Sequence, residues 1–216
     1  ASTAILDNSD SILVLLDIFY VIKNLYYINM IIIHPLINPV IVSFGFIQIR
    51  WYSLAYVLGF IIGLYLIKKI NNKFSIPLQN KELDNFFIWS VLGIIIGGRL
   101  GYTLFYQTES IIYDPLSILF IWQGGMSFHG GLIGIILSMI LYVQKKRINF
   151  FQLSDLVATV APIGIFLGRL ANFINVELYG RVTNFPFAMI YPNIDNQTRH
   201  PSQLYEAFFE GLFLFI

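Results

Sequence analysis

Four stretches of this chain are apolar over a length that would cross a lipid bilayer. They run from about 51 to 67, 84 to 106, 126 to 143 and 153 to 176, and a fifth begins near Gln203 and is still apolar at Ile216. A helix needs about 20 mostly apolar residues to cross the hydrocarbon core. Only 12% of the residues are charged, against about 25% in soluble domains. We therefore expect an all-α, polytopic membrane protein with at least five spans or part-spans, and not a soluble enzyme, a disordered chain or a collagen-like chain.

Basic residues orient these predicted spans. The loop after the first span and the loop after the third are basic, whereas the loop of about 107–117 has no lysine or arginine. By the positive-inside rule, both basic loops are cytoplasmic, and the stretches 30–50, 107–117 and 177–202 face outward. The net charge is only +1, so no basic field indicates nucleic acid as a partner. The basic residues of the two loops are Lys68, Lys69, Lys73 and Lys81, and Lys145, Lys146 and Arg147.

The chain has no cysteine. It therefore has no disulfide, no thiolate metal site and no cysteine nucleophile of its own, and any thiol chemistry needs a thiol that arrives on a substrate. The only aspartates within four residues of one another are Asp7 and Asp10. This excludes the aspartate-rich metal motif of a phosphatidyl-alcohol transferase, and we expect neither a metal nor a cofactor.

Two arginines lie within the apolar spans. An arginine at the centre of a span costs about 2.5–3.5 kcal/mol, so such residues usually face a polar interior and mark a site. For Arg99, a site and an ordinary interhelical contact are equally good interpretations. Arg169 is followed by Asn172, Asn175 and Glu177, and helix packing alone explains one such polar residue better than four. Glu206 and Glu210 are four apart on the last span and could partner a cation, which the pattern does not identify.

Other candidates come with a structural alternative. His129 lies between Gly124-Gly125 and Gly130-Gly131, which permits irregular backbone and close approach of a ligand, although a single histidine is as often a packed hydrogen-bonding residue. Tyr52 has the position of an interface-belt aromatic, and a phenol directed into a site is the alternative. Gly-x-x-x-Gly pairs indicate close helix contact. They are Gly59/Gly63, Gly93/Gly97, Gly97/Gly101, Gly130/Gly134 and Gly164/Gly168.

Together these residues indicate a polar cavity, biased to the outer side, that contains arginine, asparagine, carboxylate and imidazole. Arginine pairs well with phosphate, and at membrane depth the obvious phosphate belongs to a phospholipid head group. The alternative is a transporter or channel whose arginine and histidine line a solute path. Transporters often show two related halves with interrupted helices, and the chain has no internal repeat of that kind.

Five runs resemble the prolipoprotein diacylglyceryl transferase family, in the family's order. They are 50–56 (RWYSLAY), 97–102 (GGRLGY), 124–131 (GGMSFHGG), 168–181 (GRLANFINVELYGR) and 199–206 (RHPSQLYE). The resemblance extends from near Met30 to the last residue. It implies a transferase of the bacterial cytoplasmic (inner) membrane that moves the diacylglyceryl group of phosphatidylglycerol to the lipobox cysteine thiol of a prolipoprotein. The products are a thioether and glycerol phosphate, in the first step of lipoprotein maturation.

The resemblance also implies roles for single residues. Arg169 is similar to the family's phosphatidylglycerol-binding arginine, and His129 to the histidine often proposed as the base that activates the thiol. Such a base is useful because a free thiol with a pKa near 8.5 is mostly protonated at neutral pH. Asn172, Glu177 and Tyr52 match further residues of functional importance, assigned here to substrate binding. Arg99, Tyr205 and Glu206 are candidates for either a site or a structural role.

The chain departs from the family pattern in two respects. Val176 and Ala171 stand where the family usually or often has glycine, and Val176 is expected to restrict the backbone. The family has about seven spans and a second essential arginine near the C-terminal end, so we expect that the chain continues beyond Ile216 and that residues 1–216 alone are inactive. Residues 1–29 match nothing in the family and are expected to be an extension before a catalytic domain of residues 30–216.

Overall fold

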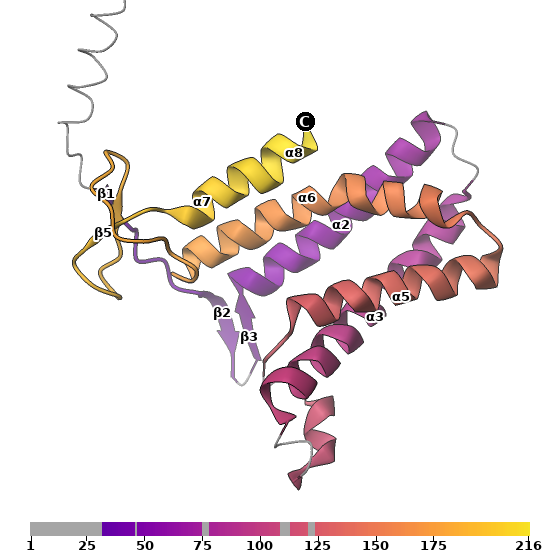
Figure 1. The fold of residues 1–216 in the computed structure, drawn as a ribbon, viewed down its shortest axis with the longest axis horizontal. Helices are drawn as coiled ribbons and strands as arrows, with labels where there is room; N and C mark the ends of the chain where they lie inside the picture. Colours follow the sequence, from indigo (N-terminus) through magenta and orange to yellow (C-terminus); the bar gives the residue numbers. More distant parts are fainter. Residues whose placement is uncertain (1–31, 46, 75–77, 109–112, 121–123) are drawn as a thin grey trace, which may run out of the picture. The chain divides into compact units, whose positions relative to one another are not determined.

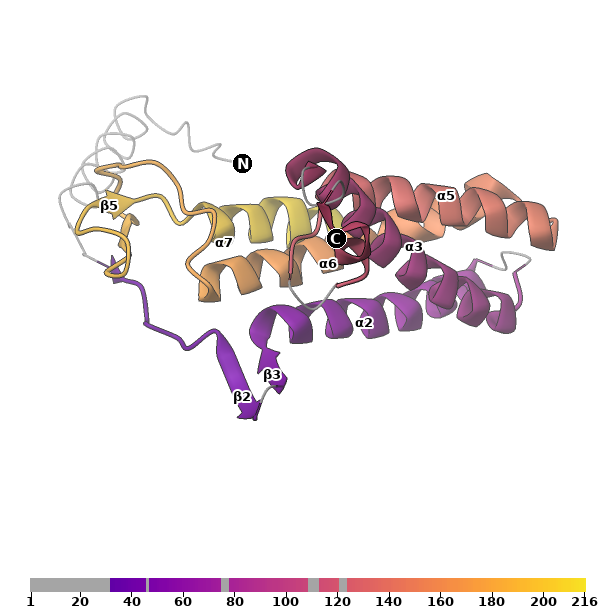
Figure 2. The same ribbon diagram turned by 90° about the horizontal axis from the view of Figure 1, so that it is seen from below.

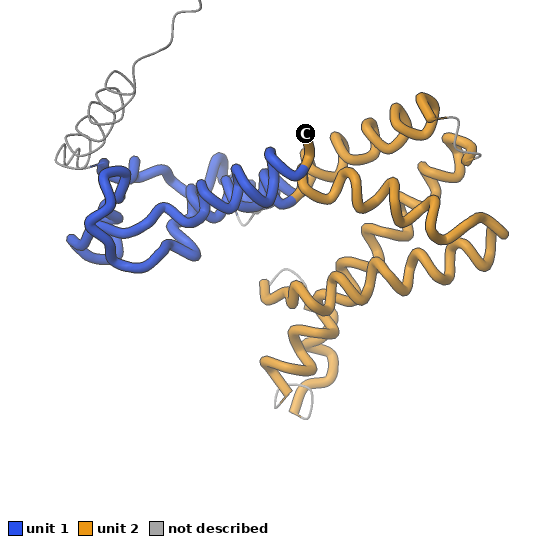
Figure 3. Tube along the Cα trace, turned by 45° about the horizontal axis from the view of Figure 1, so that its top comes forward, with its two compact units in different colours: residues 1–56, 165–214 blue, residues 57–164, 215–216 orange. Residues whose placement is uncertain are grey.

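A computed structural model describes residues 32–45, 47–74, 78–108, 113–120 and 124–216 (Figure 1). The chain divides into two compact units (Figure 3). Unit 1 contains the residues up to Tyr56 and Ile165–Leu214, and unit 2 contains Val57–Gly164 and Phe215–Ile216. The predicted extension of residues 1–29 lies outside the described residues.

Four long helices make up most of the described chain: α2 (Trp51–Lys73), α3 (Asn80–Tyr106), α5 (Phe128–Lys146) and α6 (Phe150–Ile174). Each is long and apolar enough to cross a membrane, which confirms the four predicted spans and the polytopic helical class. The bounds differ by several residues because helix and apolar run need not end together. α2, for example, continues past Ile67 through Lys68 and Lys69 to Lys73. Many of the large apolar side chains are exposed, as expected where lipid covers them.

In unit 2, α3 and α5 are antiparallel and lie in contact along a seam of glycines. Gly93, Gly97 and Gly101 of α3 face Gly130 and Gly134 of α5. A Cβ atom built on Gly97 would lie 2.8 Å from the Gly134 Cα atom, too close for two carbon atoms. The two backbones therefore approach as closely as the absence of side chains permits, and the predicted close contact of these glycine pairs is confirmed.

The same prediction is wrong for Gly164/Gly168 in the described part of the chain. A Cβ atom built on either residue would meet no atom within 4 Å. The Gly-x-x-x-Gly spacing therefore marks a close contact between α3 and α5, and no such contact is made by the spacing on α6 among the described residues. For Gly63, the nearest atom to such a Cβ is Val160 Cγ2 at 3.8 Å, which is ordinary van der Waals contact.

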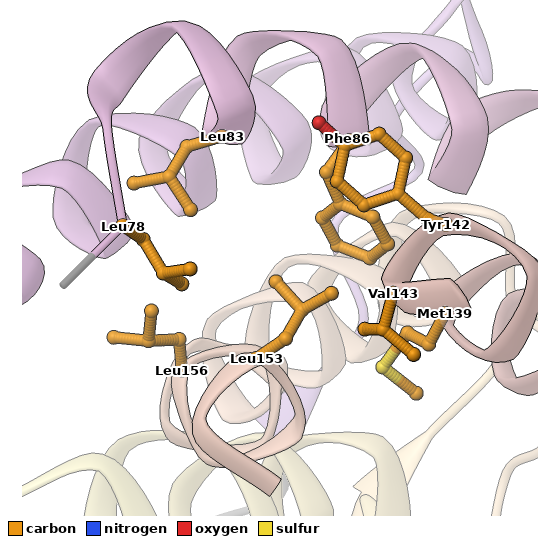
Figure 4. Close-up of a cluster of buried hydrophobic side chains, with 8 residues drawn as sticks. All are labelled: Leu78, Leu83, Phe86, Met139, Tyr142, Val143, Leu153 and Leu156. Carbon is orange, nitrogen blue, oxygen red and sulfur yellow. The ribbon is translucent and has the colours of Figure 1, made fainter. Parts of the chain in front are cut away.

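A hydrophobic cluster fills the end of unit 2 that carries the basic loops. Figure 4 shows its eight side chains, which come from the segment before α3 and from α3, α5 and α6: Leu78, Leu83, Phe86, Met139, Tyr142, Val143, Leu153 and Leu156. The Tyr142 hydroxyl donates to the Glu82 carbonyl oxygen at 2.7 Å, and Lys145 Nζ lies 5.3 Å from the centre of the Trp89 ring. The end of α5 and the start of α3 are thus held together. Both basic loops therefore lie at the same end of unit 2.

Unit 1 contains short strands that the sequence did not predict. β2 (Val40–Phe44) and β3 (Ile47–Arg50) form an antiparallel hairpin directly before α2. β1 (Ile32–Ile33), β4 (Met189–Ile190) and β5 (Thr198–Arg199) form a three-stranded sheet in the order β1-β4-β5. Strands of two residues have no alternation that a sequence pattern could reveal.

The predicted fifth helix begins at Ser202. It consists of α7 (Ser202–Glu206), a π-helical segment (Ala207–Leu212) and α8 (Phe213–Phe215). Within unit 1 it lies against the C-terminal part of α6, as both ribbon views show (Figures 1 and 2), with Gly211 so close that a Cβ atom would lie 2.8 Å from Phe166 Cα. This packing sets α7 beside the polar end of α6.

Candidate functional site

The residues predicted for the site fall into both units. Unit 1 contains Tyr52, Arg169, Asn172, Glu177, Tyr205 and Glu206, and unit 2 contains Arg99 and His129. Each unit has its own set of polar contacts.

In unit 1, the structure brings Tyr52, Asn172 and Glu177 together. The Asn172 amide is buried, and its Nδ2 donates to Glu177 Oε2 at 3.0 Å and to the Tyr52 hydroxyl at 3.3 Å. These contacts join the start of α2 to the end of α6. The Tyr52 phenol is therefore part of a polar cluster, and the interpretation as an interface-belt residue, which the residue pattern alone favoured, does not describe its contacts.

Glu177 lies in a tight turn that ends α6. Its backbone N–H donates to the Asn172 carbonyl oxygen at 2.9 Å, and its Oε1 atom accepts from Asn175 Nδ2 at 3.3 Å. The residues on either side are both left-handed, with φ of 58° at Val176 and 53° at Leu178. Such values are rare for residues other than glycine and exceptional for a β-branched one. Val176, which the resemblance sets at a usual glycine position, therefore lies where the backbone favours glycine.

Arg169 pairs with the two carboxylates of the last helical run. Its Nε atom lies 3.0 Å from Glu206 Oε2, and its Nη2 atom lies 3.5 Å from Glu210 Oε2. The side chain is 27% exposed. Arg169 is thus the cation that the spacing of Glu206 and Glu210 left unidentified. Within the described part of the chain, its Nη1 atom makes no hydrogen bond with protein.

Tyr205 has a different neighbour. Its hydroxyl lies 3.4 Å from Nδ1 of His200, and the two rings meet edge to face with centroids 5.9 Å apart. The backbone of His200 lies beside Gly180, whose N–H donates to the His200 carbonyl oxygen at 2.9 Å. A Cβ atom on Gly180 would lie 2.8 Å from the Cβ atom of His200, so this approach requires glycine.

An ion pair holds the segment between α6 and α7. Arg199 donates to Asp195 from Nη2 at 2.5 Å and from Nε at 3.3 Å, and its guanidinium lies 5.2 Å from the centre of the Tyr179 ring. These hydrogen bonds lower the pKa of the Asp195 carboxyl. The segment contains one aspartate and two arginines, and nothing in the sequence pattern pairs Asp195 with Arg199.

Arg99, in unit 2, is buried with only 4% of its surface exposed. Its hydrogen-bond partners among the described residues are backbone carbonyl oxygens: Ile118 at 3.0 Å, Ser117 at 2.7 Å, and Gly124 at 2.5 Å with Gly125 at 3.4 Å. These groups belong to the 3₁₀ helix η1 (Pro115–Leu119) and to the segment before α5. The contacts favour the structural of the two interpretations: Arg99 ties the loop to the end of α3.

His129 is the second residue of α5 and is exposed. Ser127, the residue before the helix, caps it: its Oγ accepts from the Gly130 N–H at 3.2 Å. The irregular backbone expected around His129 lies before it, where Gly124 and Gly125 have φ of 82° and 80°. His129 itself is helical, so its imidazole is carried on a regular and capped element.

Among the described residues, no three histidine, aspartate or glutamate side chains are grouped so that they could hold a metal ion. In unit 1, the Glu177 carboxylate accepts hydrogen bonds from Asn172 and Asn175, and Glu206 and Glu210 lie within ion-pair distance of Arg169. Chemically, this arrangement offers a partly exposed guanidinium and a neighbouring set of hydrogen-bond donors and acceptors near the end of α6.

Comparisons with known proteins identify the family. Residues 39–216 match the prolipoprotein diacylglyceryl transferase family. The phosphatidylglycerol–prolipoprotein diacylglyceryl transferases of Rickettsia canadensis and Rickettsia typhi are both 54% identical to this chain, over 183 and 181 residues, which are 85% and 84% of it and 71% and 70% of those proteins. The corresponding protein of Rickettsia akari is 52% identical over 181 residues. None of these relatives favours the transporter alternative. The chain is a multi-pass membrane protein, and it belongs to the prolipoprotein diacylglyceryl transferase family of enzymes.

Proposed function

We propose that this protein transfers the diacylglyceryl group of phosphatidylglycerol to the lipobox cysteine thiol of a prolipoprotein. The reaction forms a thioether, releases glycerol phosphate and is the first step of lipoprotein maturation. Family membership supports the reaction. The observation that supports it in this chain is Arg169, a partly exposed guanidinium on a helix long and apolar enough to cross a membrane.

Arg169 binds the phosphate of the lipid head group. Guanidinium pairs with phosphate through charge-assisted hydrogen bonds, and the Nε contact with Glu206 at 3.0 Å holds the group in one orientation. The longer 3.5 Å contact with Glu210 is the one that an incoming phosphate replaces. As the carbon–oxygen bond to the phosphate breaks, the electron pair stays on the departing phosphate oxygen. A fixed guanidinium stabilises that developing charge.

Asn172, Glu177 and Tyr52 bind the uncharged part of the head group. The glycerol head group of phosphatidylglycerol presents hydroxyls, and a carboxylate accepts hydrogen bonds from hydroxyls. Glu177 is exposed, and the Asn172 amide holds its carboxylate at 3.0 Å. A carboxylate fixed in this way offers its remaining lone pairs in a constant direction, which favours a diol over a head group without donors.

His129 removes the proton from the lipobox thiol. The thiolate is the nucleophile, and imidazole is the side chain suited to accept a proton near neutral pH. The exposed position of His129 on the first turn of α5 gives a substrate access to the ring. The sulfur then attacks the glycerol carbon that carries the phosphate, so that a carbon–sulfur bond forms as the carbon–oxygen bond breaks.

The enzyme works in the bacterial cytoplasmic (inner) membrane, with its site toward the outer side and residues 30–216 within its catalytic domain. The basic loops support this orientation by the positive-inside rule, because both lie at one end of unit 2. Glu177 and Tyr205 both lie within residues 175–216, which contain no lysine.

The test uses full-length protein in phosphatidylglycerol vesicles with a radiolabelled diacylglyceryl group and a lipobox peptide. Wild type should label the peptide, and a peptide with serine in place of its cysteine should stay unlabelled. Arg169→Ala should abolish transfer. Arg50→Ala is the matched control because Arg50 is exposed and its side chain donates only to Gln48 among the described residues. Near-normal transfer by Arg169→Ala would remove the phosphate-binding role, and a wild type without transfer would refute the proposed reaction.

The histidine is tested separately, by the pH profile. His129→Gln keeps a polar side chain of similar size but cannot take up a proton. We expect a loss of transfer by about 10²–10⁴-fold, the usual contribution of a general base. A variant that kept most of its rate with an unchanged pH profile would place the base elsewhere.

A further inference from the structure

Gln203 is the most enclosed polar side chain near the candidate site, although it is not among the residues proposed to touch a substrate. It lies in the first turn of α7 and is 0% exposed. Its Nε2 atom donates to the backbone carbonyl oxygen of Glu177 at 2.6 Å, and its Oε1 atom accepts from the Tyr191 hydroxyl at 3.1 Å. Burying an amide is unfavourable unless both of its ends are hydrogen-bonded, and here both are.

The group that Gln203 holds is the turn that carries Glu177. This turn has left-handed backbone on both sides of Glu177, at Val176 and Leu178. Backbone of that kind persists only when surrounding contacts determine it. Two of those contacts come from consecutive residues of α7: Gln203 binds the Glu177 carbonyl, and Ser202 Oγ donates to the Leu178 carbonyl oxygen at 2.8 Å.

The Tyr191 hydroxyl sets the orientation of the Gln203 amide. A glutamine amide can be turned by half a revolution with little change in shape, which exchanges its donor and its acceptor. Because the Tyr191 hydroxyl donates a hydrogen bond, the amide oxygen Oε1 has to face it, and Nε2 then faces Glu177. Tyr191 is fully buried and stacks on His34 with ring centroids 5.2 Å apart. Burial raises the pKa of Tyr191 to about 12, so its hydroxyl keeps the proton that it donates across the neutral range.

We infer that Gln203 is a positioning residue for the Glu177 carboxylate and so for recognition of the phosphatidylglycerol head group, an inference that rests on the proposed function. Gln203 fixes the backbone of Glu177, and the fixed backbone keeps the carboxylate 3.0 Å from Asn172 Nδ2. Three residues later, Glu206 holds Arg169. One short helix therefore aligns both the phosphate-binding group and the hydroxyl-binding group.

The test separates the two Michaelis constants of the transfer reaction in Gln203→Met, whose side chain has similar length but cannot donate to Glu177. Misplacement of a head-group ligand should raise the KM for phosphatidylglycerol about tenfold, the factor that corresponds to the loss of one hydrogen bond of about 1.4 kcal/mol, and leave the KM for the peptide unchanged. A purely structural role would reduce the fraction of active protein, which lowers the apparent kcat and leaves both KM values alone. Gln197→Met, at an exposed glutamine of the same segment, is the matched control.

Tyr191→Phe is the second variant, and it keeps the inference testable if Gln203→Met does not fold. It retains the buried ring and removes only the hydroxyl that orients the amide, so the same KM should rise, by a smaller factor of about threefold. If Gln203 acts through Glu177, adding Gln203→Met to Glu177→Gln should raise that KM no further. Unchanged KM values in both single variants, or a full additional effect in the double variant, would overturn the positioning role while wild-type transfer still stands. A wild type without transfer would overturn the proposed function itself.

Discussion

Val176 can be replaced by glycine and by alanine to measure the strain in the turn that carries Glu177. Its φ of 58° is left-handed, which costs an L-residue roughly 1–2 kcal/mol and glycine nothing. At an ordinary helical position the order is reversed, because glycine is less stable than alanine by about 1 kcal/mol. The sign of the stability difference between the glycine and alanine variants therefore reports the backbone conformation. It does not depend on the loss of the valine side chain, because both variants lack that side chain.

We expect Val176→Gly to be more stable than Val176→Ala by about 1 kcal/mol. Relative to wild type, Val176→Gly loses a half-buried side chain, at about 1 kcal/mol, and gains about as much from relief of strain, so the two should be nearly equal in stability. Val157 is the matched control because it is also half-buried but lies within the regular helix α6. There, glycine should be the less stable variant by about 1 kcal/mol.

The assay is equilibrium unfolding in detergent micelles, followed by helical circular dichroism for all four variants and wild type. The reasoning is refuted if alanine is the more stable substitution at both positions, because the backbone at Val176 would then not be left-handed. The transfer rates of the same variants show whether strain matters for function. If the left-handed turn is what holds the Glu177 carboxylate, Val176→Gly should retain the rate of wild type.

Three further perturbations follow from contacts described above. Arg99→Met leaves four carbonyl oxygens without their donor. Since a hydrogen bond to a charged group contributes about 1.5–3 kcal/mol, the free energy of unfolding in detergent should fall by at least about 3 kcal/mol. A fall below about 1 kcal/mol would contradict these contacts. Gly97→Ala should lower the free energy of unfolding by about 1–3 kcal/mol because α3 and α5 must separate. Gly164→Ala, with no described atom within 4 Å of the new methyl group, should be neutral or stabilising. Equal stability of the two variants would argue against the glycine seam. Arg199 lowers the pKa of Asp195. The stabilisation by the charged carboxylate is therefore complete above the ordinary aspartate pKa and is lost as the pH falls through the lowered value, below about pH 4. Cleavage of the 177–202 segment by an acid-active protease should accelerate in that pH range in wild type and show no such step in Asp195→Asn.

The spans and the polar end of α6 could be predicted because each leaves a periodic or compositional signal. Twenty apolar residues are a long signal, and Arg169, Asn172 and Glu177 stand out against an apolar background. Arg99 produced the same signal, yet its contacts are structural. A guanidinium within a span looks identical in sequence whether backbone carbonyls or a substrate satisfy it, because the carbonyls are provided by residues of any type.

The arrangement of the segment between α6 and α7 could not be predicted. Its strands are two residues long, and its buried groups contact residues far away along the chain: the Ile190 carbonyl oxygen accepts from the His34 N–H at 2.9 Å, and the Tyr191 ring stacks on that of His34. Such pairings depend on how the chain closes on itself and leave no local pattern. The left-handed turn was partly visible, because Val176 was recognised as a departure from glycine. Sequence alone did not show that this departure coincides with strain.

The glycine seam between α3 and α5 restricts how this protein can change in evolution. A bulky residue in most helix interfaces can be accommodated when its neighbour becomes smaller, so the two positions drift as a pair. At Gly97 and Gly134 the facing residue is already glycine, and no smaller residue exists. A larger residue on one helix of the seam therefore cannot be compensated by a smaller one on the other, so substitutions have to accumulate at positions outside the seam.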